Sequence, residues 1–270
     1  MKMIDLHCHI LPGLDDGAQN MEEALAMSRA AREDGIEKIV ATPHLFRDNF
    51  NYEDLNIIEE KRKELVQELK KDNINVEILA GAEVHISHNL IDEIRKHRSF
   101  LVVGRSSYMF VEFPPEHVYS GVKELFFELM SEGITPIIAH PERNSVFIHN
   151  PVLLYDLIQM GGLAQANSGS FSGMFGSEVE AAIFQFVGWN LIHFIGSDGH
   201  NSRSKAPRLS EAVKKAASVI GEERAKALVT DNPQAVLDDV ELPDYHEPIN
   251  PSEKEKTMKV KLPFWRKRKL

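Results

Sequence analysis

The chain has 270 residues, of which 43% are hydrophobic, and it contains 12 histidines but only one cysteine. This composition excludes disordered and fibrous chains. A single cysteine also excludes an internal disulfide and a thiolate zinc site, so any metal must have nitrogen and oxygen ligands. No apolar run reaches the roughly 18 to 20 residues that span a membrane, and the N-terminus does not resemble a signal peptide. We therefore expect a globular, cytoplasmic protein.

Charge is distributed unevenly along the chain, whose net charge is −10. Residues 251–270 contain eight Lys or Arg and two Glu, a net +6, which leaves −16 for residues 1–250. Such an acidic body disfavours nucleic acid as a partner. For the basic tail, a solvated and frayed terminus is the main expectation, and weak contact with an anionic membrane surface or an acidic partner is the alternative.

Short apolar segments alternate with segments of helical periodicity along most of the chain. Predicted strands cover residues 3–9, 38–43, 76–82, 108–113, 135–139, 163–166 and 191–196. Predicted helices cover residues 20–34, 53–71, 88–96, 117–132, 151–160, 177–188, 208–220, 222–230 and 232–238. Alternating strands and helices predict a parallel sheet, and about seven repeats favour an irregular α/β barrel. We predict a barrel domain over residues 1–242 and a Pro-containing, basic tail over residues 243–270.

A potential metal ligand lies at the C-terminal end of six of these strands. The residues are His7 and His9 in DLHCH, His44 after IVATP, Glu83 after ILAGA, Glu112 in MFVEF, His140 after PIIA, and Asp198 and His200 in SDGH. Active sites of α/β barrels are built at these strand ends. The pattern therefore predicts that the eight side chains meet at one mouth of the barrel.

The most specific indication of a metal site comes from the first and last residues of this set. His7 and His9 are two residues apart in a strand, so they face the same side, whereas Cys8 faces the opposite side. Alone, an H-x-H pattern is weak. Its combination with Asp198 and His200, a D-x-H pattern near the other end of the domain, is much more specific.

Other ionisable residues have ordinary structural explanations. Asp15 and Asp16 lie in the loop after the first strand, and a turn or a helix cap explains Asp15 as well as a ligand role does. His193 lies inside an apolar strand, where a buried, hydrogen-bonded core histidine is the expectation.

Histidines and carboxylates without thiolates suit Mn, Fe or Zn, and carboxylates can bridge two or three ions about 3.5 to 4 Å apart. Such a cluster activates water and clamps the oxygens of a phosphoester. Arg143, in HPER, belongs to the same rim and can hold phosphate with a bidentate fork, and Arg203 and Lys205 are further candidates. A C-x5-R phosphatase loop from Cys8 is excluded, because Leu14 stands where arginine is needed.

The motifs IDLHCHILPGLDDGA, ATPH, GAEVH, FVEFP, AHPER and SDGHN, in this order, resemble the polymerase-and-histidinol-phosphatase (PHP) superfamily. Within it, HILPGLDDGA and HPER resemble the manganese-dependent protein-tyrosine phosphatases of bacterial capsule and exopolysaccharide clusters. The resemblance covers about residues 3–240. It implies a distorted (β/α)7 TIM-like barrel with three divalent metal ions, Mn being the first candidate and Fe or Zn the alternatives.

The resemblance also implies a role for each site residue. The three sets of metal ligands would be His7, His9, Glu83 and Asp198; Glu83, Glu112 and His140; and Asp16, His44 and His200. Arg143 matches the phosphate-contacting arginine of the family. A second family arginine is expected five residues after the D-x-H histidine, but this chain has Lys205 there and Arg203 two residues earlier.

The function implied is hydrolysis of phosphotyrosine by metal-activated hydroxide. The implied substrate is the tail of a membrane-associated bacterial tyrosine kinase that regulates capsular or exopolysaccharide synthesis. Two alternatives stay open, namely a PHP-type small-molecule phosphatase acting on a compound such as histidinol phosphate, and a non-catalytic adaptor stabilised by metal.

Overall fold

The computed structural model describes residues 1–47, 50 and 52–254, so the basic end of the predicted tail lies outside the described residues. The strands are β1 (Met3–Cys8), β2 (Ile36–Ala41), β3 (His44–Leu45), β4 (Glu77–Ala80), β5 (Glu83–His85), β6 (Tyr108–Glu112), β7 (Thr135–Ala139), β8 (Leu163–Asn167) and β9 (Phe194–Gly196). The α-helices are α1 (Met21–Asp34), α2 (Asn56–Lys71), α3 (Leu90–Leu101), α4 (Val122–Ser131), α5 (Ser145–His149), α6 (Pro151–Gln159), α7 (Ser177–Gly188), α8 (Ser210–Ile220), α9 (Glu222–Ala227), α10 (Asp231–Asp238) and α11 (Pro251–Lys254). Two 3-10 helices, η1 (Pro141–Arg143) and η2 (Ser168–Ser172), follow β7 and β8.

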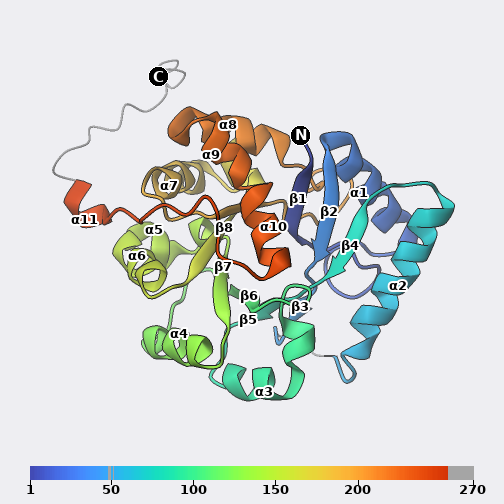
Figure 1. Ribbon diagram of the computed structural model, residues 1–270, viewed down its shortest axis with the longest axis horizontal. Coiled ribbons are helices and arrows are strands. Elements are labelled where there is room, and N and C mark those ends of the chain that lie inside the picture. The colour runs from blue at the N-terminus through green and yellow to red at the C-terminus, as the bar shows by residue number, and fades with distance from the viewer. Residues whose placement is uncertain (48–49, 51, 255–270) are drawn as a thin grey trace.

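The strands form a distorted α/β barrel with an outer layer of helices, which confirms the predicted fold (Figure 1). Every strand pair is parallel, in the order β1-β2-β4 in one sheet and β3-β5-β6-β7-β8-β9 in the other. Short breaks separate β2 from β3 and β4 from β5, so the nine described strands occupy seven positions around the barrel. β3 and β5 lie just beyond the predicted ranges 38–43 and 76–82. At the first break, Pro43 has no N–H and so cannot donate a hydrogen bond to a neighbouring strand. Its carbonyl accepts from the Glu83 N–H at 3.0 Å, which keeps the two segments adjacent across the break.

The barrel closes between β1 and the residues after β9. Cys8 and Gly199 form an isolated parallel bridge. The Asp198 N–H donates to the His7 carbonyl at 2.8 Å, and the His9 N–H donates to the Gly199 carbonyl at 2.9 Å. Closure therefore brings the H-x-H and D-x-H segments, about 190 residues apart in sequence, side by side.

Apolar side chains fill both the barrel interior and the layer between strands and helices. Inside the barrel, Phe110 and Phe194 belong to a cluster that includes Val236 of α10, the helix that lies across the N-terminal end of the strands (Figure 1). Outside the barrel, Met27 of α1 and Phe126 of α4 belong to the larger cluster. Each such fully buried side chain contributes about 1.5 to 3 kcal/mol of hydrophobic stabilisation, so the two layers hold the strand ends in place.

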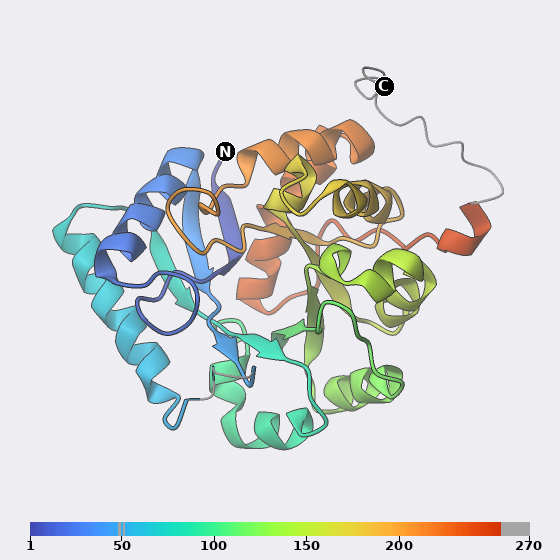
Figure 2. The ribbon, with the colours of Figure 1, turned by 180° about the vertical axis from the view of Figure 1, so that it is seen from behind.

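Loops at the opposite end of the barrel come together on one face. Figure 2 shows the loop after β1, in dark blue, and the loop after β9, in orange, on the face turned toward the viewer. The first of these loops leads into α1, which begins where the Asn20 side chain accepts from the Glu23 N–H at 3.0 Å. Gly35 ends that helix with a positive φ of 95°, a conformation that glycine adopts without strain.

Several helices differ from the sequence prediction. Helix α3 runs to Leu101, past the predicted end at residue 96, and the short helix α11 was not predicted. The helix predicted over 117–132 begins only at Val122, because residues up to Gly121 form a turn in which the Val122 N–H donates to the Tyr119 carbonyl. Helix α5 was not predicted, since five residues are too few for a periodic pattern. It begins at Asn144, whose side chain accepts from the N–H groups of the second and third helical residues.

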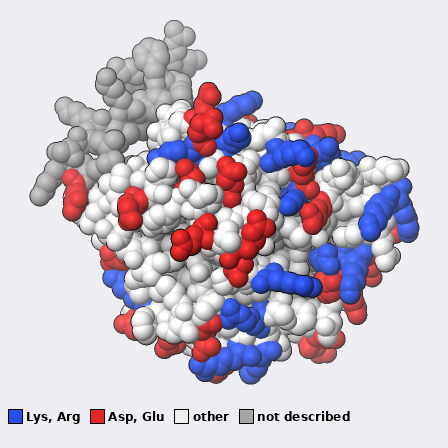
Figure 3. Space-filling model, viewed as in Figure 1, with Lys and Arg blue, Asp and Glu red and all other residues white. Residues whose placement is uncertain are grey.

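The first part of the predicted tail lies along the barrel. The Asp244 N–H donates to the Asn232 side chain at 3.2 Å, and the Ile249 N–H donates to the Trp189 carbonyl at 2.8 Å. Within the described residues no helix is both long and apolar enough to cross a membrane. Figure 3 shows acidic and basic side chains interspersed over the face seen in Figure 1.

His193 is a buried core histidine, as its position in an apolar strand predicts. Its Nδ1 accepts from the Ala164 N–H at 3.1 Å, and its ring stacks on Tyr245 with 5.7 Å between ring centroids. Its Nε2 has no hydrogen-bond partner among the described residues. Burial lowers the pKa of His193 to about 4, because the charged form loses its hydration.

This pKa predicts a pH-dependent contribution to stability. The unfolded chain binds a proton at His193 below its ordinary pKa of 6.5, whereas the folded chain does so only near pH 4. Stability is therefore lost as pH falls through this window, by about 3 kcal/mol. In urea denaturation at pH 8 and pH 4, we expect the free energy of unfolding to fall more for the wild type than for His193→Gln. The exposed His149→Gln should behave as the wild type, and equal losses in all three proteins would contradict the prediction.

Candidate metal centre

The structure brings all nine predicted metal ligands together at the C-terminal end of the barrel. They lie on β1 and the loop after it, on β3, β5 and β6, and directly after β7 and β9. We call this set the candidate metal centre: His7, His9, Asp16, His44, Glu83, Glu112, His140, Asp198 and His200. Most of the set is buried, and Asp16, whose side chain is 55% exposed, marks the side that faces solvent.

Glu83 lies at the middle of the candidate metal centre and is fully buried. Its Oε1 is 2.9 Å from Nε2 of His140 and 3.4 Å from Nε2 of His7. Its Oε2 is 2.9 Å from Nδ1 of His44 and 3.4 Å from Nε2 of His9. One carboxylate thus faces four imidazoles from three strand ends, those of β1, β3 and β7, which is the placement that a bridging ligand requires.

Three groups in this centre have ligand atoms within 4.8 Å of one another. One group comprises His7, His9 and Asp198, with Asp198 Oδ1 3.3 Å from His9 Nε2 and 3.6 Å from His7 Nε2. These distances place the H-x-H and D-x-H side chains around one point, and the Nε2 atoms of the two histidines are 3.3 Å apart.

The second group lies on the solvent side and comprises His9, Asp16, His44 and His200. Asp16 Oδ1 is 3.4 Å from His44 Nε2 and 3.5 Å from His200 Nε2. Three imidazoles from separate segments of the chain and one carboxylate converge here.

The third group comprises His44, Glu83 and Glu112. The sequence resemblance implies His140 as the partner of the two glutamates. In the structure His140 contacts Glu83, and it is His44 that reaches both carboxylates, with Nδ1 3.7 Å from Glu112 Oε2. His85 Nδ1 lies 3.4 Å from the same oxygen.

The donor set fits divalent metal ions. His44 Nδ1 and Glu83 Oε2 are buried and lie 2.9 Å apart, yet neither has a hydrogen-bond partner among the described residues. Buried polar atoms normally have partners, so unpaired lone pairs directed into a cluster of carboxylates and imidazoles are suited to cations. The absence of thiolate among the nine ligands favours Mn, Fe or Zn over an iron–sulfur cluster.

Electrostatics keep the central carboxylates ionised. Burial by itself raises a carboxyl pKa, but His7 and His140 hold the pKa of Glu83 well below its usual range. Asp198 behaves in the same way. Burial raises its pKa, but the hydrogen bond from His9 and the nearby charges of His7, His200 and His140 together hold that pKa well below its usual range. Both carboxylates therefore present negative oxygens, which a metal ligand must do.

Side chains outside the predicted set orient the histidines. His9 Nδ1 lies 2.7 Å from Asp15 Oδ2, and His7 Nδ1 lies 2.7 Å from Gln165 Oε1. Pairing at Nδ1 leaves Nε2 free to face the centre, as is usual for metal-binding histidines. Asp15 also accepts from the N–H of Gly17, where a Cβ atom would lie 2.1 Å from the His9 carbonyl oxygen.

These orienting residues differ in how far the sequence could reveal them. Asp15 stands in the DDGA motif, and the turn that it was expected to form is present, but its contact with His9 was missed. Gln165 carries no sequence signal, because a lone glutamine inside a strand pattern indicates nothing about its partner.

Two candidate ligands have strained backbone conformations. His140 and Asp198, each just past the end of a strand, have φ values of 31° and 49°. Non-glycine residues rarely adopt the left-handed region, and such strain is concentrated at functional sites. The conformation turns both side chains toward the barrel axis, where they meet Glu83 and His9.

Arg143 lies at the mouth of the candidate metal centre. Its Nη1 donates to Asp198 Oδ2 at 2.6 Å, and the Asn167 side chain donates to the same oxygen at 2.7 Å. Its guanidinium carbon lies 4.4 Å from the centre of the Phe175 ring. The arginine is thus fixed from two sides and partly exposed, with further N–H groups available for an anion.

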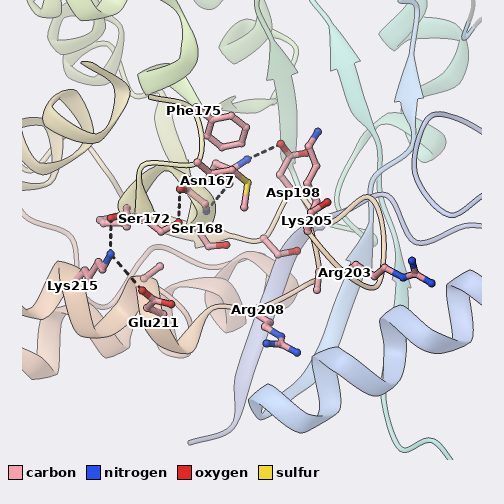
Figure 4. Close-up of a pocket in the computed structure, with 17 residues that line it drawn as sticks. Asn167, Ser168, Ser172, Phe175, Asp198, Arg203, Lys205, Arg208, Glu211 and Lys215 are labelled. Atoms are coloured by element: carbon pink, nitrogen blue, oxygen red, sulfur yellow. Dashed lines mark hydrogen bonds and ion pairs between the residues drawn. The ribbon is translucent and has the colours of Figure 1, made fainter. Parts of the chain in front are cut away.

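The other two predicted cations lie farther away. Arg203 and Lys205 line a pocket of about 150 Å³ that also includes Asp198 and Phe175 (Figure 4). Within the described residues neither of these cations forms an ion pair with a carboxylate of the centre.

One cation at the centre was missed by sequence reasoning. Arg47 Nη1 lies 2.9 Å from His44 Nε2 and 3.1 Å from Glu112 Oε1. No motif surrounds it in the sequence, so only the structure reveals its place.

Cys8 is on the opposite side of β1 from the two histidines. It is fully buried, its thiol donates to the Gly199 carbonyl at 3.6 Å, and burial raises the pKa of the thiol well above its usual value. The single cysteine is therefore neither a metal ligand nor an available nucleophile.

Known proteins share this sequence and fold. The chain is 37% identical over 235 residues to the tyrosine-protein phosphatase YwqE of Bacillus subtilis, covering 87% of this chain and 91% of YwqE. It is 30% identical over 244 residues to the tyrosine-protein phosphatase CpsB of Streptococcus pneumoniae, covering 88% and 99% of the two chains. A crystal structure from work on YwqE and CpsB, described as unique metal-dependent tyrosine phosphatases, superposes with a TM-score of 0.87 at 35% identity, covering 92% and 99%.

A protein-family model also matches most of this chain. The model, described as capsular polysaccharide synthesis, CpsB/CapC, matches residues 3–238, a range that contains every residue of the candidate metal centre and Arg143. The chain therefore belongs to the CpsB/CapC family.

Proposed function

We propose that this protein is a metal-dependent tyrosine-protein phosphatase. The observation that carries the proposal is the convergence of nine imidazole and carboxylate side chains next to Arg143, in a chain of the CpsB/CapC family. Relatives that carry the name tyrosine-protein phosphatase, at 30 to 37% identity over most of both chains, support the same activity.

The nine side chains would hold three divalent ions, with Mn as the first candidate and Fe or Zn as alternatives. When bound, such ions lower the pKa of water and neutralise charge on a phosphoester. His7, His9, Glu83 and Asp198 supply the buried ligands, and Asp16 with His200 supplies ligands on the side where substrate enters. The pairing of His7 and His9 with neighbouring side chains holds their rings ready for this role.

Arg143 would bind the phosphate oxygens of the substrate. Its hydrogen bond to Asp198 and its stacking on Phe175 fix the guanidinium at the rim before substrate arrives. Arg203 and Lys205, on the wall of the adjoining pocket, are the candidates for a second cation beside the phosphate. A covalent phosphocysteine route does not fit this chain, because Cys8 is buried on the far side of β1.

The proposed substrate is the phosphotyrosine-bearing tail of a membrane-associated bacterial tyrosine kinase that regulates capsular or exopolysaccharide synthesis. The capsular polysaccharide description of the family supports this substrate class. Such a tail lies in the cytoplasm, where the phosphatase would act. A free, extended tail suits a site at the open end of a barrel, because it can reach a recessed centre.

The role of the candidate metal centre predicts the effect of removing single ligands. With Mn supplied, His7→Ala and Asp198→Ala should each lower kcat on a phosphotyrosine peptide by more than about 100-fold, because each removes a buried ligand. Circular dichroism should show that both variants remain folded. His149→Ala, which removes an exposed histidine, should keep full activity. Full activity in His7→Ala or Asp198→Ala would overturn the mechanism, and a preference for histidinol phosphate would favour the small-molecule alternative.

Metal removal tests the cofactor directly. Elemental analysis of the purified protein should find about three divalent ions per chain, matching the three ligand groups. Chelation should abolish turnover, and single metals added back should restore it, Mn most effectively. Glu83→Gln should lower metal content, because the glutamine side chain loses the negative charge that faces four histidines. Activity that persists in metal-free protein would contradict the proposal.

A further inference from the structure

One aromatic side chain at the rim of the candidate metal centre is not used by either core cluster. Phe175 lies on the turn between η2 and α7, is partly exposed, and is absent from the apolar side chains that pack against the two clusters. Within the described residues its ring also has no aromatic neighbour. The guanidinium of Arg143 lies over the ring, with its central carbon 4.4 Å from the ring centre.

The turn that carries Phe175 is built to hold the ring at the rim. The Met174 N–H donates to the Gly169 carbonyl at 3.2 Å, and the Gly176 N–H donates to the Gly173 carbonyl at 3.0 Å. Gly173 and Gly176 have φ values of 75° and 97°, which glycine adopts without strain. These bonds fix the backbone on both sides of Phe175, so the ring is presented by a closed turn.

Phe175 and a candidate metal ligand line the same pocket. The pocket of about 150 Å³ is lined by Phe175, Asn167 and Asp198 (Figure 4). The figure shows the Phe175 ring beside the Asn167–Asp198 hydrogen bond, on the side of the pocket nearest the strands. A phosphate held by Arg143 therefore has an aromatic wall next to it.

We propose that Phe175 is a specificity-determining residue, whose ring packs against the phenyl ring of phosphotyrosine while Arg143 holds the phosphate. The inference rests on the proposed phosphatase function and deepens it. In phosphotyrosine a flat ring lies between the phosphate and the peptide backbone, whereas in phosphoserine only a single methylene does. An aromatic side chain beside the phosphate site can thus pack against the ring of phosphotyrosine, whereas phosphoserine has no ring for it to contact.

The ring has a second role through Arg143. A guanidinium stacked on an aromatic face loses conformational freedom, while its N–H groups point outward in the guanidinium plane and can still donate hydrogen bonds. Phe175 therefore also acts as a positioning residue for the phosphate-binding arginine. These two roles predict different kinetic effects, because loss of aryl contact depends on the substrate and loss of positioning does not.

The test compares two peptides that differ only in phosphotyrosine or phosphoserine. For Phe175→Ala with Mn supplied, we expect the ratio of the two kcat/KM values to fall about 3- to 10-fold, mostly through a higher KM for phosphotyrosine. Phe175→Tyr should restore the ratio because it keeps a stacking face. Phe127→Ala, which removes a 66% exposed phenylalanine on α4, serves as the matched control and should leave the ratio unchanged.

Several outcomes separate this inference from the proposed function. If the wild type hydrolyses neither peptide, the proposed function itself fails. If the wild type hydrolyses phosphotyrosine and Phe175→Ala lowers both kcat/KM values equally, Phe175 only positions Arg143 and the specificity role is overturned. Another aromatic near the candidate metal centre is Phe50, whose ring stacks on that of His44 with 5.4 Å between the ring centroids. If Phe50→Ala abolishes the preference and Phe175→Ala does not, the phenyl ring lies on that side and the proposal is wrong.

Discussion

Burial of the Glu83 carboxylate is the constraint on which the rest of the site depends. A lone carboxylate deep in a protein costs several kcal/mol, so it must be surrounded by groups that favour its charged form. Here the surroundings are four histidines from three strand ends, those of β1, β3 and β7. A closed ring of parallel strands brings these separate segments to one point, and in this chain the barrel thereby satisfies the buried carboxylate.

The same constraint extends into the residues behind the histidines. An imidazole is a useful ligand only when its other nitrogen is occupied, which fixes the ring and its tautomer. Asp15 and Gln165 do this for His9 and His7, Asp15 from the loop after β1 and Gln165 from β8. Gly17 then lets the loop approach β1 closely enough for Asp15 to reach. The geometry of the candidate metal centre therefore depends on neighbouring residues from other segments as well as on the ligands themselves.

Arg143 contacts both a candidate metal ligand and an aromatic side chain at the rim of the site. It donates to Asp198, a candidate ligand, and stacks on Phe175, which no core cluster uses. In the proposed reaction, a phosphotyrosine would direct its charged phosphate oxygens toward the candidate metal centre and its ester oxygen toward its own aromatic ring. Asp198, Arg143 and Phe175 lie in the matching order of carboxylate, cation and aromatic face. Under the proposed function, this order would link catalysis to substrate choice.

Sequence alone determined the seven strand positions, the parallel barrel and the set of ligand-type residues, because buried strands and their polar ends leave short, regular patterns. It also excluded a C-x5-R phosphatase loop beginning at the lone cysteine, because position 14, where the arginine would be needed, is Leu14. Tertiary structure alone decided that His44 reaches both Glu83 and Glu112, and that Phe175 meets Arg143. The physical reason is that these contacts join segments far apart in the chain, and their geometry depends on barrel closure and strained turns that no local pattern records.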